Sequence, residues 1–259
     1  MEDGFLIFAA ILFESAARYF LIAGIAFLIF YNLFSDKFRL QKIQKRAAKR
    51  KDFIREIVHS ASSTLIFAII AFLLLATPLR DYTQAYSEVG DYPIWWIGAS
   101  LALSLIIHDT YFYWMHRLMH HPKIYKHAHL VHHKSINPTP FASYSFHWLE
   151  AIGEGLVLVP LLFLLPMHDL TVLLFTASSF VINVYGHLGY EIMPKFVRKT
   201  AIFSIINTST HHNLHHSRFN GNYGLYFRFW DRIMGTEIPE YVEIYDKLRM
   251  KREPEASFK

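Results

Sequence analysis

The sequence predicts an all-α integral membrane protein with about three to five transmembrane or re-entrant helices and a cytosolic helical cap that holds a histidine-rich dimetal site. Three observations support this fold class. Hydrophobic residues make up 53% of the 259-residue chain and charged residues only 18%, a balance that soluble domains rarely show. Long apolar segments recur along the chain, and the polar segments beside them carry three regularly spaced clusters of histidines.

The first two apolar segments, Phe5–Phe34 and Ala61–Leu79, are each long enough to cross a hydrocarbon core, which takes about 20 helical residues. The chain starts with acidic residues, so we interpret the first segment as a retained membrane helix rather than a signal peptide. Glu14 and Arg18 interrupt it at a spacing that lets them pair on one helix face. The basic run 37–55 lies between two apolar segments, which favours a cytosolic membrane-flanking loop over a nucleic-acid site.

A third span is expected to begin with Ile94–Ile107 and to continue through His116. A cytosolic loop between spans one and two implies that this third helix returns to the cytosolic side, where its histidines lie. Two further apolar segments, Ala151–Pro166 and Leu170–Gly186, are short for full spans and predict a thin transmembrane hairpin or a re-entrant one. The hairpin must end on the cytosolic side if the later histidines are to meet the earlier ones.

The histidine clusters read HRLMH, HLVHH and HNLHH. Spacings of three and four residues project side chains from one face of a helix. The chain has no cysteine, so thiolate metal sites are excluded, and neutral imidazole suits Zn, Cu, Fe or Ni. Eight imidazoles are too many for one ion and suit two. The residues are His116 and His120, then His129, His132 and His133, then His212, His215 and His216.

His187 is predicted as a ninth ligand, although a helix-end role is the alternative. Asn183, four residues earlier on the same face, could be a weak or water-mediated partner. His108 and Asp109 are expected to support the ligands from outside the metal site or to pack between helices. The acidic residues that could accept hydrogen bonds from ligand rings are Asp109, Glu150, Glu191 and Asp231. The histidines not predicted as ligands are His59, His121, His127, His147, His168 and His211. His211 could exchange roles with His212. His147 could line the site or pack on Trp148.

The stretches HRLMHH, HLVHHKSINPTPFAS, HLGYEIMP, THHNLHH and NYGLYFRFWDRIMGT together resemble the fatty acid hydroxylase / sterol desaturase superfamily of membrane-bound histidine-box di-iron oxidoreductases. The nearest likeness is to sterol carbon-5 desaturases, while HLGYE is closer to the hydroxylase and methyl-oxidase branches. The resemblance implies that the eight clustered histidines are iron ligands and that His187 matches a further family histidine. We therefore divide a single structural domain into N-terminal membrane helices with a basic cytosolic loop (1–93), a catalytic region (94–238) and a polar tail (239–259).

The resemblance also implies two non-haem Fe ions, O2 as co-substrate and an external electron donor such as a cytochrome b5-like protein or a ferredoxin with its reductase. The expected reaction hydroxylates or desaturates an unactivated C–H position of a membrane lipid, with sterols, fatty acyl chains, sphingoid bases and ether lipids all open. The site would face the cytosol from a bacterial inner membrane or the endoplasmic reticulum. A histidine-rich metal transporter or sensor is the alternative, and a zinc hydrolase is a weaker one because no HExxH motif is present.

Overall fold

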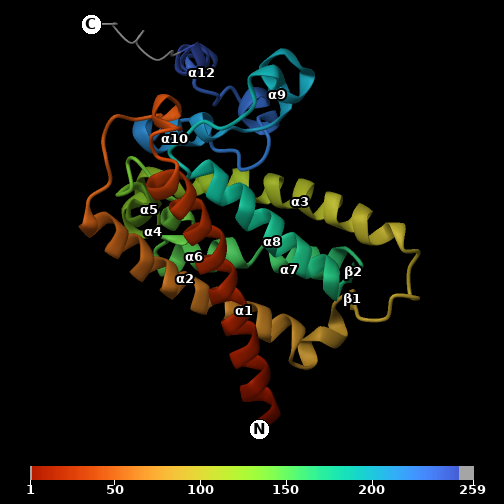
Figure 1. Ribbon diagram of the computed structural model, residues 1–259. Helices are drawn as coiled ribbons and strands as arrows, with labels where there is room; N and C mark the ends of the chain where they lie inside the picture. The colour runs from red at the N-terminus through yellow and green to blue at the C-terminus, as the bar shows by residue number, and fades with distance from the viewer. Residues whose placement is uncertain (1, 251–259) are drawn as a thin grey trace, which may run out of the picture.

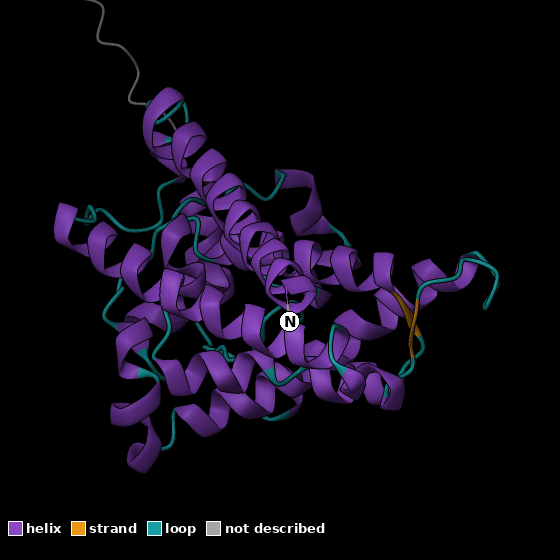
Figure 2. Ribbon diagram, turned by 90° about the horizontal axis from the view of Figure 1, so that it is seen from below, coloured by secondary structure: helices purple, strands orange, loops and turns teal. Residues whose placement is uncertain are grey.

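Helices are the main elements of the computed structural model, which describes residues 2–250 (Figure 1). Among these residues, β1 and β2 form a two-stranded parallel sheet at an edge of the molecule (Figure 2). The helices are α1 (Glu2–Phe27), α2 (Arg50–Leu75), α3 (Trp95–Met119), α4 (Pro122–Ala128), α5 (Leu130–His133), α6 (Trp148–Gly155), α7 (Leu158–Leu164), α8 (Asp169–Gly186), α9 (Ala201–Ile205), α10 (Ser209–Arg218), α11 (Phe229–Ile233) and α12 (Tyr241–Met250), and the strands are β1 (Ala85–Tyr86) and β2 (Met167–His168).

Within residues 2–250, three helices are long and apolar enough to cross a membrane: α1 with its π-helical continuation to Leu33, α2, and α8. On α1, Phe5 is 70% exposed and Phe13 is 75% exposed, as expected for side chains that face lipid rather than water. The expected pair forms, because Arg18 Nη1 lies 2.6 Å from Glu14 Oε1. The same nitrogen donates to Thr176 Oγ1 at 3.0 Å and so ties α1 to α8.

The second span differs from its expected bounds at both ends. Helix α2 begins at Arg50, inside the basic run, because the Lys49 backbone N–H donates to the Asp52 carboxylate and closes the first turn. It ends at Leu75, and Pro78 starts a separate 3₁₀ turn through Tyr82. The basic connection is therefore shorter than the run of basic residues.

Helix α3 continues past His116 as expected, but its polar second half keeps it out of the set of helices apolar enough to span a membrane. The predicted hairpin is asymmetric. Its first arm is broken into the short helices α6 and α7, whereas its second arm is the continuous 18-residue α8. The turn between the arms forms β2, which pairs with β1 from the polar stretch before α3. Of the two arms, α8 therefore has the length and composition of a full span.

The histidine-bearing helices α5 and α10 gather at the end of the molecule away from the N-terminus, and α1 rises toward them (Figure 1). The C-terminal helix α12 covers this end. Its Tyr241 and Tyr245 are buried against Val197, Phe203 and Leu214. The segment expected to be a polar tail therefore begins with a docked amphipathic helix, and its residues 251–259 lie outside the described part of the chain.

Candidate metal centre

Four parts of the fold bring histidines to one place. The end of α3 supplies His116 and His120, the α4–α5 segment supplies the HLVHH residues, the end of α8 supplies His187, and α10 supplies the HNLHH residues. The structure gathers all nine predicted residues into two groups, and within each group the ligand atoms lie within 4.8 Å of one another. Eight of the nine are buried, and His120 is partly exposed.

The first, here called the five-histidine group, contains His116, His120, His129, His133 and His215. Its Nε2 atoms face one another closely. The distance is 3.1 Å between His116 and His129, 3.1 Å between His133 and His120, and 3.2 Å between His120 and His215.

The second, the four-histidine group, contains His132, His187, His212 and His216. His187 Nε2 lies at its centre, 3.3 Å from His132 Nε2, 3.1 Å from His212 Nε2 and 3.2 Å from His216 Nε2. Neighbours in sequence fall into different groups, because consecutive helical residues point about 100° apart. His132 and His133 are split in this way, as are His215 and His216, so the two groups lie side by side.

The hydrogen bonds on the far side of the rings decide where the protons lie. The Nδ1 atoms of His116, His187 and His215 each donate at 2.8 Å to a backbone carbonyl, of Tyr223, Asn183 and Gly221 respectively. A carbonyl only accepts, so Nδ1 carries the hydrogen and Nε2 of a neutral ring is a bare lone pair. Bare lone pairs converging at about 3 Å repel one another unless a cation lies between them, so the donor set fits a bound metal.

Burial keeps these imidazoles neutral. It lowers the pKa of His187 to about 4 and of His133 to about 3. Metal ligation requires neutral imidazole, so the electrostatics of the pocket suit two ions, one for each group. Burial, reinforced by neighbouring imidazoles, also lowers the pKa well below its ordinary value for His129, His132, His212, His215 and His216.

Of the four acidic residues predicted to support the ligands, Glu150, at the start of α6, contacts a histidine of the two groups. Its Oε1 lies 2.7 Å from His129 Nδ1, and the side chains are only 1% and 2% exposed. Burial raises the pKa of Glu150 and lowers that of His129, so the isolated pair is neutral. With a cation at Nε2, the ring would donate from Nδ1 to the carboxylate, which orients the ligand.

The other three acidic residues hold backbone instead of imidazole. Asp109 accepts from Tyr226 N at 2.7 Å, and Asp231 accepts from Tyr223 N at 2.9 Å. Both thereby hold the loop whose Tyr223 carbonyl orients His116. Glu191 accepts from Thr210 N at 3.0 Å and from its hydroxyl at 2.7 Å, at the start of α10. Sequence reasoning missed the carbonyl partners because every residue carries a carbonyl and no sequence signal marks the ones used.

The Asn183 side chain has a partner away from the histidines, because its amide donates to Ser143 O at 2.9 Å. A water-mediated role for it stays a prediction. The Asn183 backbone carbonyl, fixed by the helix, receives the His187 hydrogen.

The remaining histidines lie outside both groups. His108 Nδ1 is 2.8 Å from the Tyr226 hydroxyl, and its ring packs against Phe112 and Phe175. His211 is fully buried against Tyr241 rather than exchanged with His212. His147 and His168 accept from the backbone at helix starts, and His147 also packs on Trp148. His121 and His127 are exposed, and His59 is half-buried.

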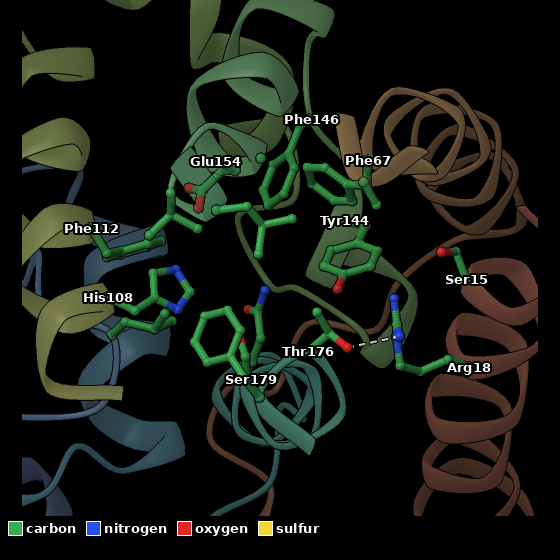
Figure 3. A pocket seen from close by; sticks show the side chains of 17 residues that line it. Ser15, Arg18, Phe67, His108, Phe112, Tyr144, Phe146, Glu154, Thr176 and Ser179 are labelled. Atoms are coloured by element: carbon green, nitrogen blue, oxygen red, sulfur yellow. Dashed lines mark hydrogen bonds between the residues drawn. The ribbon is translucent and has the colours of Figure 1, made fainter. Parts of the chain in front are cut away.

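A cavity lies beside the two groups, between α1, α2, α3, α6 and α8 (Figure 3). Phe112 and Phe146 line it. The Phe112 ring centroid is 4.9 Å from that of His116, and the Phe146 centroid is 5.1 Å from that of His132. One aromatic ring therefore separates the cavity from each histidine group, and the other lining residues combine apolar side chains with polar ones such as Arg18 and Glu154. Such a cavity suits a lipid-like molecule held close to both groups.

Residues 101–236, which contain every residue of both groups, match the family model described as fatty acid hydroxylase. The chain belongs to the fatty acid hydroxylase family. Within this family it is similar to lathosterol oxidases and Delta(7)-sterol 5(6)-desaturases, which agrees with the likeness to sterol carbon-5 desaturases seen in the motifs.

The rat lathosterol oxidase is 35% identical over 184 residues, which cover 70% of this chain and 60% of the rat protein. The human lathosterol oxidase is 31% identical over a stretch covering the same 70% and 60%. A Delta(7)-sterol 5(6)-desaturase of Gibberella zeae is 27% identical over 250 residues, 93% of this chain and 76% of the relative. The matched stretch thus spans less than two thirds of the mammalian relatives. No solved structure matches the chain.

Proposed function

We propose that this membrane protein is an O2-dependent di-iron oxidoreductase that desaturates or hydroxylates an unactivated C–H position of a membrane lipid. The observation that carries the proposal is the pair of buried histidine groups whose unprotonated Nε2 atoms converge beside an apolar cavity. A redox metal fits better than zinc, because the similar proteins are described as an oxidase and as desaturases. No side-chain acid, base or nucleophile removes hydrogen from an unactivated carbon, so bound iron would supply the oxidising chemistry.

The residues of this chain then have three tasks. The five-histidine and four-histidine groups hold one iron each, with Nδ1 of His116, His187 and His215 anchored on carbonyls so that the rings cannot turn. Glu150 orients His129. The aromatic rings of Phe112 and Phe146 lie between the cavity and the metals, where they exclude water and position the lipid carbon that reacts.

The side of the membrane is proposed from the basic connection between α1 and α2, residues 34–49. The Gln44 amide donates to Ile136 O at 2.9 Å and to Asn213 Oδ1 at 2.7 Å, so this connection contacts the histidine-bearing segments directly. Loops rich in lysine and arginine stay in the cytosol. The contact therefore supports a centre that faces the cytosol, where a cytochrome b5-like protein or a ferredoxin with its reductase would deliver electrons.

Metal analysis of the detergent-purified chain tests the proposal. We expect two irons for each chain, one in each histidine group, and O2-dependent change of a lipid in a host that carries the gene, measured by lipidomics against a host without it. One exchangeable ion and no lipid change would favour the transporter or sensor. Two zinc ions without iron would contradict redox chemistry.

A further inference from the structure

Two side chains at one end of the cavity have polar atoms without a hydrogen-bond partner among the described residues. His108, from α3, is 6% exposed and lines the cavity. Its Nδ1 is engaged by the Tyr226 hydroxyl at 2.8 Å, whereas its Nε2 has no hydrogen-bond partner among the described residues. Leaving a buried ring nitrogen unpaired is unfavourable, so this atom is available to a ligand.

Glu154, from α6, lines the same cavity. Among the described residues its carboxyl group forms no side-chain hydrogen bond or ion pair, whereas that of its neighbour Glu150 contacts His129. Figure 3 shows Glu154 and His108 on the same side of the cavity as Phe112, with Arg18 and Ser15 on the opposite side. A carboxyl group in mainly apolar surroundings is costly without a partner, and this one faces the space that a ligand would fill.

Polar groups at the other end of the cavity are partly engaged by protein. Arg18 donates from Nη1 to Glu14 and Thr176 while its Nε has no partner among the described residues, and the Asn183 amide donates to Ser143 O. The end closest to the metal centre differs in placing an imidazole and a carboxyl group beside Phe112, which contacts both His108 and His116.

We propose that His108 and Glu154 form a subsite that binds the hydroxyl of a lipid alcohol, which deepens and rests on the proposed function. A hydroxyl donates one hydrogen bond and accepts others. With the Tyr226 hydroxyl donating to Nδ1, Nε2–H of His108 donates to the ligand oxygen, and the ligand hydroxyl donates to Glu154. One ligand group thus satisfies both side chains.

The subsite lies near the metal centre, because His108 precedes His116 by two helical turns, about 12 Å along the axis of α3. We assign it to a ring lipid of the sterol type, the class that the names of the relatives give, whose hydroxyl is carried on the same ring system as the carbon that reacts.

Binding of two matched probes tests the subsite without requiring turnover. The full chain in lipid nanodiscs is titrated with radiolabelled lathosterol and with its 3-O-methyl ether, which cannot donate a hydrogen bond. We expect the wild type to bind the alcohol at least about tenfold more tightly, because a site built for a hydroxyl rejects an analogue that leaves its polar groups unpaired. Glu154→Leu should abolish the preference, and Glu154→Gln should keep part of it because an amide still accepts. Thr176→Val, at the opposite end of the cavity, should keep all of it.

Equal affinity of the wild type for the two probes, or no saturable binding of the alcohol, overturns the subsite and needs no variant. A preference that survives in Glu154→Leu overturns the role of Glu154. Iron content measured on the same preparations separates this inference from the proposed function. Two irons without a preference leave the di-iron proposal standing, whereas a preference in protein that holds no iron retains the subsite and removes the metal assignment.

Discussion

The contact between Glu150 and His129 offers the sharpest test of how the protein holds its metals. Among the described residues, Glu150 is the one carboxylate that contacts a histidine of the five-histidine group. Two routes give the size of its effect. A buried hydrogen bond to a charged partner contributes about 1.5–3 kcal/mol. Loss of a carboxylate behind a histidine ligand lowers metal affinity about 10- to 100-fold, which is about 1.4–2.7 kcal/mol.

Two substitutions should therefore give a graded result. Glu150→Gln keeps a carbonyl oxygen that accepts from His129 but removes the charge, so we expect iron affinity to fall about tenfold. Glu150→Leu removes the acceptor, so the loss should reach about 100-fold. Metal-stripped protein is titrated anaerobically with Fe(II) against a competing chelator. Two dissociation constants are fitted, and we expect the variants to change one of them, that of the five-histidine group. Thermal unfolding of the metal-free proteins should change little for Glu150→Gln, because the pair is neutral without a cation.

Glu56→Gln is the matched control. Glu56 is also fully buried, and its carboxylate accepts from Ser135 and Thr139 and from no histidine side chain among the described residues. Its iron affinity should equal that of the wild type. Wild-type iron affinity in Glu150→Leu, in protein that folds normally, would refute the reasoning that the carboxylate orients a ligand.

Three further predictions concern the neighbours of the centre. His212→Ala should lose the iron of the four-histidine group, whereas His211→Ala, its buried neighbour outside both groups, should keep two irons by metal analysis; equal iron in both variants would contradict the grouping. Arg228→Met removes two hydrogen bonds to Glu237, which keeps only its longer ion pair with Arg232, and leaves a buried carbonyl unpaired. It should destabilise the protein by about 2–3 kcal/mol in denaturant unfolding, and an unchanged midpoint would contradict this. Gly224→Ala places a Cβ against the Phe227 backbone oxygen, in the loop that orients His116, and should lower both iron content and stability, by about 1–3 kcal/mol. Gly98→Ala, with no atom within 4 Å of its new Cβ, should change neither.

Local periodicity explains why much of the fold was predictable from sequence. Apolar runs of sufficient length predicted α1 and α2, and the spacing of three and four residues predicted that each histidine cluster projects from one helix face, because both properties depend only on residues within a few turns. The helix boundaries were less predictable. Asp52 started α2 early, and the first arm of the hairpin broke into α6 and α7, since these details depend on caps and on packing between segments.

The candidate centre divides in the same way. The sequence by itself determined which histidines share a helix face, and it offered Glu150 as one of four candidate acidic partners. Only the tertiary structure decided that His132 and His133 belong to different groups, that carbonyls of Tyr223 and Gly221 hold the rings, and that the Asn183 amide donates to Ser143 O. The physical reason is range: helical phase repeats every 3.6 residues, whereas a shared ion site and its hydrogen-bond partners require segments far apart in the chain to pack against one another.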